Sequence, residues 1–178
     1  MTFAETKLSG LYIIEPKVWN DSRGYFMEAF KKAELENHIG SVDFIQENES
    51  VSTKNVLRGL HYQEGDAAQA KLVRVIKGRV WDVAVDIRKN SPTYGHYELV
   101  ELSEENKRQL FIPRGFAHGF LVLSDYALFL YKVDNVYFPT MERTIDCFDS
   151  EINIPWPISP DEAILSEKDK NGKAFKDI

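Results

Sequence analysis

The 178-residue sequence contains a single cysteine, no long apolar run and no excess of positive charge. Because Cys147 has no second cysteine to pair with, an internal disulfide is excluded and a reducing compartment is expected. No stretch approaches the roughly 18 apolar residues of a membrane-spanning helix, and the first residues lack the apolar core of a secretion signal. We therefore expect a cytoplasmic protein with no membrane partner.

The charge balance of the chain is acidic. Its 28 Asp and Glu residues outnumber its 22 Lys and Arg residues, which gives a net charge of −6. Such a charge gives no general attraction to nucleic-acid phosphates, so we expect no nucleic-acid partner, although a local basic pocket is compatible with it. Hydrophobic residues make up 43% and charged residues 28% of the chain, which is the ordinary composition of a globular domain.

Short segments of alternating polar and apolar residues, separated by glycine and proline, dominate the chain. The alternation predicts a hairpin from residues 71–76 and 79–87, joined at Lys77-Gly78. Further strands are predicted at residues 97–102, 109–112, 119–123 and 128–133. Many short strands with regular turns favour an all-β antiparallel sandwich or barrel.

Only two stretches favour a helix. They are residues 29–38, which end shortly before Gly40, and residues 161–168. We find no internal repeat, no low-complexity tract and no interdomain linker, so a single domain over residues 1–178 is predicted.

Two of the four histidines are candidates for chemistry. His61 lies in a strand-like run with Arg58, and His118 follows a turn that contains a proline and a glycine. Arg58 and His61 are three residues apart, so a bulge or bend near Gly59 is needed if both are to point inward. The other two, His38 and His96, end a predicted helix and follow a turn, and we expect them on the surface.

A metal site is not favoured by the residues around His61. Many β-barrels bind a metal through a His-X-His pair, a carboxylate and a distant histidine, but the second residue after His61 is Gln63. We therefore expect catalysis without a metal. In such a site a histidine removes a proton, a carboxylate orients the histidine, a tyrosine returns a proton, and a lysine stabilises negative charge on an oxygen.

Nine runs of residues resemble one known family when taken in order. They are EPK at 15–17, DSRGYF at 21–26, NVLRGLHYQ at 55–63, KLVR at 71–74, WDVAVDIR at 81–88, IPRGFAHGF at 112–120, FLYK at 129–132, YFP at 137–139 and IPWP at 154–157. Together they resemble the dTDP-4-dehydrorhamnose 3,5-epimerase family over nearly the whole chain. The resemblance implies a cupin-type double-stranded β-helix, or jelly roll, with a few short helices, usually as a homodimer with the active site inside the barrel.

The resemblance also implies an activity and assigns roles to residues. The family inverts carbons 3 and 5 of dTDP-4-dehydro-6-deoxy-glucose to give dTDP-4-dehydro-L-rhamnose, without a cofactor. His61 matches its general base, Asp169 the carboxylate partner of that base, and Tyr131 the proton donor on the opposite face. Lys71 matches the group that stabilises the enolate, and Tyr137 the residue that stacks on thymine. The remaining positions that match the lining of the nucleotide-sugar site are Arg23, Glu28, Gln46, Asn48, Arg58, His118, Glu142 and Lys168.

Alternative functions stay open at this point. An epimerase that inverts only carbon 3 or only carbon 5 of a related dTDP-4-keto-6-deoxy-hexose could share every residue named above. A non-catalytic sugar-nucleotide-binding barrel would be expected to lack the His61, Tyr131 and Asp169 set. A metal-dependent cupin dioxygenase, and a related ketoisomerase family with a His-X-His pair, are disfavoured by Gln63.

Without the resemblance, three of these residues would have ordinary structural interpretations. Tyr131 lies in an aromatic strand and would be read as a packing residue. Lys71 and Asp169 would be read as solvated charges at a strand end and near the tail, because such residues are rarely buried without a partner. Their assignment to a site therefore depends on the resemblance.

Overall fold

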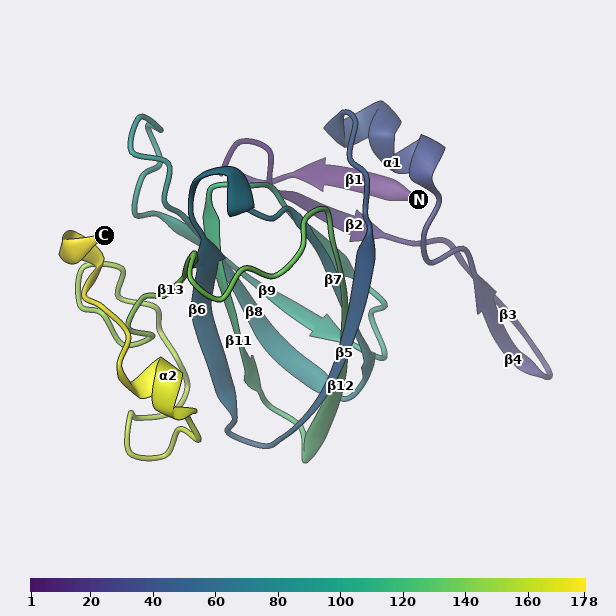
Figure 1. Cartoon of the computed structure of the whole chain (residues 1–178). Helices are drawn as coiled ribbons and strands as arrows, with labels where there is room; N and C mark the ends of the chain where they lie inside the picture. Colours follow the sequence, from purple (N-terminus) through teal and green to yellow (C-terminus); the bar gives the residue numbers. More distant parts are fainter.

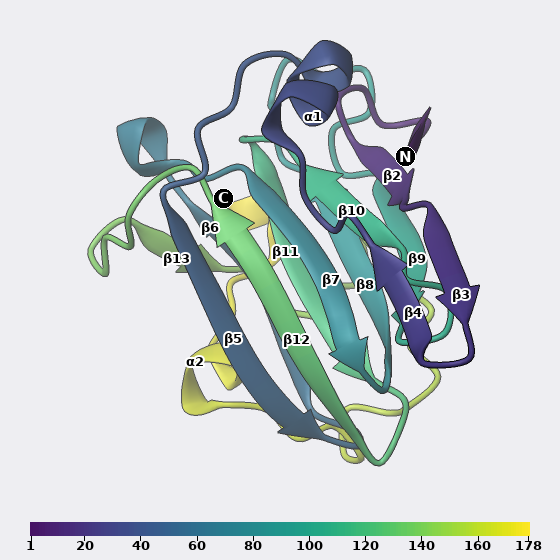
Figure 2. The ribbon, with the colours of Figure 1, turned by 90° about the vertical axis from the view of Figure 1, so that its right-hand side faces the viewer.

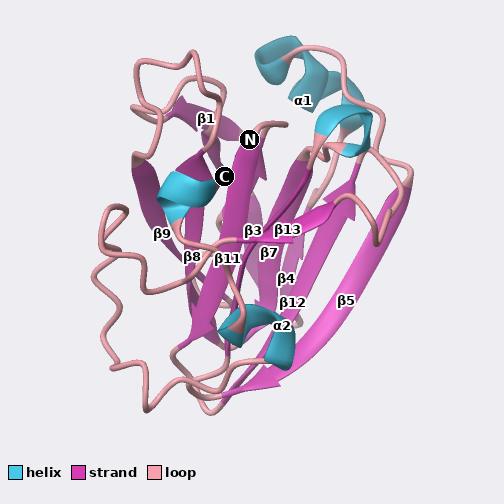
Figure 3. Ribbon diagram, turned by 60° about the vertical axis from the view of Figure 1, so that its left-hand side comes forward, coloured by secondary structure: helices cyan, strands magenta, loops and turns pink.

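The computed structural model describes all of residues 1–178, and most of its regular structure is strand (Figure 3). The strands are β1 (Thr2–Glu5), β2 (Tyr12–Glu15), β3 (Val18–Asp21), β4 (Gly24–Met27), β5 (Gln46–Thr53), β6 (Leu57–Gln63), β7 (Lys71–Lys77), β8 (Arg79–Asp86), β9 (Tyr97–Ser103), β10 (Gln109–Ile112), β11 (Phe116–Val122), β12 (Tyr126–Val133) and β13 (Glu142–Thr144). The helices are α1 (Lys32–Ile39), α2 (Glu167–Lys170) and the short 3₁₀ turns Gly65–Ala67 and Phe175–Asp177. No helix has the length and apolar character needed to cross a membrane.

Two antiparallel sheets face one another and enclose the centre of the molecule (Figures 1 and 2). One has six strands in the order β1-β2-β10-β7-β12-β5, and the other has five in the order β13-β6-β11-β8-β9. Strands that are neighbours in a sheet are mostly distant in sequence, as in a jelly roll. The predicted all-β jelly roll with a few short helices is therefore confirmed.

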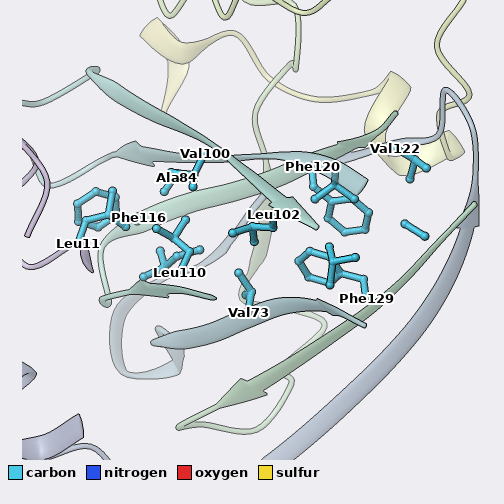
Figure 4. Packing of buried hydrophobic residues seen from close by; sticks show 14 of the residues in the cluster. Leu11, Val73, Ala84, Val100, Leu102, Leu110, Phe116, Phe120, Val122 and Phe129 are labelled. Atoms are coloured by element: carbon cyan, nitrogen blue, oxygen red, sulfur yellow. The ribbon is translucent and has the colours of Figure 1, made fainter. Parts of the chain in front are cut away.

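The core between the sheets is built by the alternation of each strand. Phe120 of β11 stacks on Phe129 of β12 with ring centroids 4.2 Å apart, and Val73 of β7 and Leu110 of β10 are fully buried in the same cluster (Figure 4). Burying a side chain of this kind contributes roughly 1.5–3 kcal/mol to folding. On the inner face of each strand, some residues are apolar and pack in this core. Other inward-facing residues of the same strands are polar and line a cavity.

The outer faces of the two sheets are partly covered. The C-terminal segment, residues 145–178, lies on the outside of the five-stranded sheet (Figure 1). There Trp156 and Phe175 belong to the same buried cluster as Leu57 and Leu60. Leu35 of α1 packs with Ile14, Leu72 and Phe111 on the outside of the six-stranded sheet. The C-terminal segment therefore lies directly behind β6, one of the strands that line the cavity.

The β3–β4 hairpin projects away from the barrel (Figure 1). It pairs only with itself, and its aromatic side chains Trp19, Tyr25 and Phe26 are 42%, 54% and 65% exposed. Because soluble monomers rarely expose apolar side chains in such a group, the hairpin has the character of an interaction surface.

The strands predicted between residues 71 and 133 are all present as β7 to β12. The predicted hairpin of residues 71–76 and 79–87 is wrong, because β7 lies in the six-stranded sheet and β8 in the five-stranded sheet, so the turn at Lys77-Gly78 passes from one sheet to the other. The predicted helix at 29–38 begins later, as α1 at Lys32. The predicted helix at 161–168 is wrong, because residues 161–165 are not helical and α2 spans only Glu167–Lys170. Ile164 forms a parallel bridge with Val56, so pairing with a distant strand prevails over local helix preference there.

Candidate active site

A cavity of about 520 Å³ opens into the barrel between the two sheets. Most of the residues that line it are polar, and they come from β5, β6, β7, β11, β12 and the 135–142 loop. All but three of the predicted site residues lie on its wall: Gln46, Asn48, Arg58, His61, Lys71, His118, Tyr131, Tyr137, Glu142 and Lys168. The exceptions are Asp169, Arg23 and Glu28.

The bulge predicted at Gly59 is present in β6. Along β11 the register passes from His118 opposite His61 to Phe120 opposite Arg58, so two residues of β6 lie opposite the single residue Gly119 of β11. Gly59 adopts a φ of +124°, and a Cβ there would lie 2.5 Å from the Cα of Gly119. A glycine is required because no side chain fits between the two strands. The bulge allows Arg58 and His61, three residues apart, to line the same cavity.

His61 forms a hydrogen-bonded pair with Asp169. The distance from Nε2 of His61 to Oδ1 of Asp169 is 2.5 Å, and Ser166 donates to Oδ2 of the same carboxylate at 2.7 Å. Burial acts to raise the pKa of Asp169, but the hydrogen bonds from His61 and Ser166 outweigh it and hold the pKa below its ordinary value. An ionised Asp169 accepts the Nε2 proton, so Nδ1 of His61 is left with its lone pair free for use as a base.

Lys71 supplies an ammonium group without an ion-pair partner. It begins β7 and its side chain lines the cavity, while the two carboxylates that influence it, Asp82 and Glu142, form their ion pairs with His118 and Lys168 instead. Burial lowers the pKa of Lys71 to about 8, against the opposing influence of Asp82 and Glu142. At neutral pH the lysine remains mostly charged, and this charge is available to an oxyanion in the cavity.

Tyr131 enters the cavity from the other sheet. It lies on β12 of the six-stranded sheet, whereas His61 lies on β6 of the five-stranded sheet. Burial raises the pKa of Tyr131, so the phenol keeps its proton at neutral pH. An imidazole and a phenol therefore approach the same space from opposite walls.

A polar cluster stands at the mouth of the cavity. Glu142 of β13 accepts hydrogen bonds from Tyr137 Oη and Lys168 Nζ, each at 2.8 Å. Burial acts to raise the pKa of Glu142, but these two hydrogen bonds hold it below its ordinary value. The ring of Tyr137 is 53% exposed, which leaves an aromatic face free to stack on a planar ligand.

Hydrogen bonds also order side chains along β5, which forms one side of the cavity. Nε of Arg58 donates to Oγ of Ser52 at 3.0 Å, and the amide of Gln46 donates to Oδ1 of Asn48 at 2.8 Å. The remaining guanidinium nitrogens of Arg58 make no hydrogen bond to the protein and can bind an anionic ligand.

Arg23 and Glu28 do not line the cavity of their own chain. Arg23 lies at the turn of the projecting β3–β4 hairpin, where its side chain is 88% exposed and forms an ion pair with Asp21 at 2.6 Å. Glu28 follows the same hairpin and lies 3.8 Å from Lys31. The expectation that these two residues join the site is not met within one chain, because the hairpin points away from the barrel.

The sequence analysis missed one buried group of the site. Asp82 on β8 is fully buried and accepts hydrogen bonds from His118. It stands among apolar residues in an otherwise typical strand, and a carboxylate at such a position needs a partner, which is the signal that could have found it. The surface positions expected for His38 and His96 are confirmed. No three His, Cys, Asp or Glu side chains are grouped so that they could hold a metal ion.

Comparison with known proteins places these features in one family. Residues 5–177 match a family model described as dTDP-4-dehydrorhamnose 3,5-epimerase. A protein of that name from Shigella flexneri is 54% identical over 178 residues, which cover 99% of this chain and 97% of the relative.

Two crystal structures have a very similar fold. One is a dTDP-4-dehydrorhamnose 3,5-epimerase from Elizabethkingia anophelis NUHP1, with a TM-score of 0.95 and 52% identity over 99% of this chain and 97% of the other. The second is a dTDP-6-deoxy-D-glucose-3,5-epimerase from Legionella pneumophila Philadelphia 1 in complex with dTDP-4-keto-L-rhamnose. Its TM-score is 0.94 and its identity 47%, over 98% of this chain and 93% of the other. The likeness therefore extends over the barrel, the hairpin and the C-terminal segment together.

Proposed function

Since the chain belongs to the dTDP-4-dehydrorhamnose 3,5-epimerase family, we propose that it inverts C3 and C5 of dTDP-4-dehydro-6-deoxy-glucose and forms dTDP-4-dehydro-L-rhamnose. The keto group at C4 acidifies the hydrogens on both neighbouring carbons. The reaction therefore needs a base, an acid on the other face of the sugar, and a positive charge at the keto oxygen. His61, Tyr131 and Lys71 meet these needs, and their arrangement around one cavity is the observation that carries the proposal.

Each inversion proceeds through an enolate. Nδ1 of His61 takes the proton from the carbon, the C–H electron pair forms a double bond to C4, and the carbonyl π pair moves to the oxygen. Asp169 stabilises the imidazolium that forms, through its hydrogen bond to Nε2. Tyr131 then donates its proton to the opposite face of the carbon, and the two side chains exchange protons with water before the next step.

One set of side chains serves both carbons because the two enolates place their charge on the same oxygen. Lys71 lies at the cavity wall without a competing carboxylate and can hold that oxygen in both steps. Arg58 provides a forked donor for the diphosphate, and Tyr137 provides an aromatic face for the thymine.

Incubation with dTDP-4-dehydro-6-deoxy-glucose in deuterium oxide tests this proposal. Deuterium at both C3 and C5, detected by NMR or mass spectrometry, is the result expected of a double epimerase. Deuterium at one carbon identifies a mono-epimerase. If deuterium enters neither C3 nor C5 although the protein is folded and binds the nucleotide sugar, the result contradicts an epimerase and favours a binding barrel.

Replacing Tyr131 with phenylalanine should impair inversion more than proton loss. The base is untouched in this variant, so deuterium still enters the substrate, but it returns to the face from which the proton left. The ratio of inverted product to exchanged substrate, measured by NMR, should fall by about 10²-fold or more. Tyr126→Phe on the same strand is the matched control, because Tyr126 is exposed outside the cavity. Equal losses of exchange and inversion would remove Tyr131 as the donor.

The dependence of kcat/KM on pH above neutrality should follow the loss of charge of Lys71. Because the pKa of Lys71 is lowered to about 8 by burial, its charge is present below that pH and lost above it. The kcat/KM, which reflects the free enzyme, should fall about tenfold per pH unit above pH 8. A profile that stays flat to pH 10 would mean that this ammonium group is not needed.

We further propose that the protein works as a homodimer in which the hairpin of one copy completes the cavity of the other. The projecting hairpin has exposed aromatic residues and carries Arg23 on an extended arm, away from its own cavity. A further exposed apolar side chain, Val51 at 61% exposure, lies on the outer face of the six-stranded sheet. A second copy would bury both surfaces and bring a guanidinium group to the diphosphate end of the ligand.

Mixing two impaired variants tests the exchanged hairpin. Arg23→Ala should lower kcat/KM about tenfold or more, and His61→Asn should remove the base. If Arg23 acts across the dimer, a mixed dimer contains one cavity with both His61 and Arg23, so refolding the two variants together restores activity. Sedimentation should give a mass of twice the 20.5 kDa of one chain. A monomer, or no recovery on mixing, would contradict the exchange.

A further inference from the structure

The cavity contains a second imidazole–carboxylate pair beside the first. His118 of β11 is the strand neighbour of His61, and Asp82 lies on β8, on the other side of β11. Nε2 of His118 lies 3.0 and 2.9 Å from the two carboxylate oxygens of Asp82. The side chain of His118 is 8% exposed and that of Asp82 is fully buried. The carboxylate therefore contacts the cavity only through the imidazole.

The other nitrogen of His118 is free to meet a ligand. Nδ1 has no hydrogen-bond partner in the protein, while His118 lines the cavity. The one buried side-chain nitrogen or oxygen that is both enclosed and unpaired belongs to Arg74, outside this pair. Nδ1 of His118 is therefore unpaired without being enclosed, and the space it reaches is the cavity.

The surroundings keep His118 neutral. Burial lowers its pKa, and the positive charges of Lys71 and His61 act in the same direction, while Asp82 opposes them without reversing the shift. A neutral imidazole next to a carboxylate carries its proton on the nitrogen that faces the carboxylate. The proton of His118 is then on Nε2, and Nδ1 presents a lone pair.

We propose that Asp82 is a positioning residue that holds His118 as a hydrogen-bond acceptor, and that Nδ1 of His118 binds a hydroxyl group of the sugar. This inference rests on the proposed function, which places a 4-keto-6-deoxyhexose in the cavity. That sugar has hydroxyl groups only at C2 and C3, so one of these two is the donor. A lone pair repels the enolate oxygen, and the contact to that oxygen is left to Lys71.

The two histidines differ in how well their surroundings tolerate a positive charge, and this difference assigns them different roles. A base becomes a cation when it takes a proton, and His61 is the more exposed of the two, at 23% of its side chain. His118 is nearly enclosed and shares its surroundings with the ammonium group of Lys71. A second positive charge there is disfavoured, so His118 recognises the substrate while His61 moves the proton.

Nitrogen NMR of the free protein tests the tautomer without any substrate. In ¹⁵N-labelled wild type, the ring signals that disappear in His118→Gln belong to His118. They should show a protonated Nε2 and an unprotonated Nδ1 from pH 6 to 8. In Asp82→Asn this single tautomer should be lost, because an amide can donate to the ring as well as accept from it. A proton on Nδ1 in the wild type overturns the inference.

Substrate analogues that lack one hydroxyl test the recognition. Deuterium entry at C5 can be followed for the full substrate and for its 2-deoxy and 3-deoxy analogues. One analogue should lose about tenfold or more in kcat/KM with the wild type, because Nδ1 is left unpaired. In Asp82→Asn, the same analogue and the full substrate should react at nearly equal rates.

Two further variants separate recognition from folding. The double variant Asp82→Leu with His118→Phe removes both polar partners, so no unpaired buried group remains, and it should also fail to distinguish the analogue. Asp86→Asn is the matched control, since Asp86 is an equally buried carboxylate of β8 that binds Arg88, Ser91 and Thr93 instead. It should keep the wild-type discrimination.

The failures of the two proposals are distinguishable. No exchange of the full substrate by the wild type overturns the proposed function, and the hydroxyl contact with it. Normal exchange with equal rates for both analogues overturns the hydroxyl contact alone. Loss of exchange at only one carbon in a His118 variant would make His118 a second base and would also overturn the inference.

Discussion

Replacing His61 with asparagine is expected to abolish measurable hydrogen exchange at both C3 and C5, with a loss of about 10²- to 10⁴-fold in rate. Both carbons flank the same keto group, and His61 lines the cavity with its Nε2 hydrogen-bonded to Asp169, which leaves Nδ1 free to take a proton. An asparagine amide does not accept a proton at neutral pH, so neither enolate forms. The measurement is deuterium entry at each carbon, followed separately by NMR.

The matched control is His96→Asn, because His96 is exposed and lies outside the cavity. Thermal unfolding shows whether the His61 variant is folded, since Asp169 loses one of its hydrogen-bond partners in it and a cost of about 1–3 kcal/mol is expected. Exchange that survives at one carbon in a folded variant would mean that a second base serves that carbon.

Lys71→Met is expected to lower kcat by about 10²- to 10³-fold through loss of the charge that faces the enolate oxygen. Methionine has a similar length and volume, so the shape of the cavity changes little. Both inversions should slow together, because both enolates place their charge on the same oxygen. A loss confined to one carbon would show that another group stabilises the second enolate.

The same substitution should make the protein more stable. Burial lowers the pKa of Lys71 from 10.5 to about 8, which corresponds to about 3 kcal/mol of lost stability. The penalty is complete below pH 8, where the lysine is charged in the folded and unfolded chain, and it disappears above pH 10.5. Denaturant unfolding at pH 7 should therefore give a higher midpoint for Lys71→Met. Lys77→Met, at the exposed end of the same strand, should change neither stability nor activity much.

Local patterns were sufficient to predict part of this fold. The alternation between residues 71 and 133 gave β7 to β12, because one face of each strand packs in the core. The spacing of Arg58 and His61 predicted the bulge at Gly59, since two residues three apart can share one face of a strand only if an extra residue is inserted.

Other features depend on contacts between distant residues and were outside the reach of local patterns. His61 and Asp169 are 108 positions apart, so only the family resemblance could pair them. Residues 161–165 are not helical, and Ile164 instead forms an isolated bridge with Val56, which precedes β6. The β3–β4 hairpin points away from the barrel and so separates Arg23 from its own cavity. The alternation of polar and apolar residues does not predict this direction.

The carboxylate that orients His61 lies on the short helix α2, which follows all the strands of the barrel in the sequence. Ser166 and Asp169 hold each other by hydrogen bonds and lie behind β6, whereas the strands of both sheets end by residue 144. A ribosome-bound or clipped chain that stops short of Ser166 would possess every strand of the barrel, yet its imidazole could rotate freely. If His61 is the base, as proposed, proton abstraction becomes efficient only when the final segment has docked, and a chain cut before Ser166 should exchange hydrogen more slowly than the full chain.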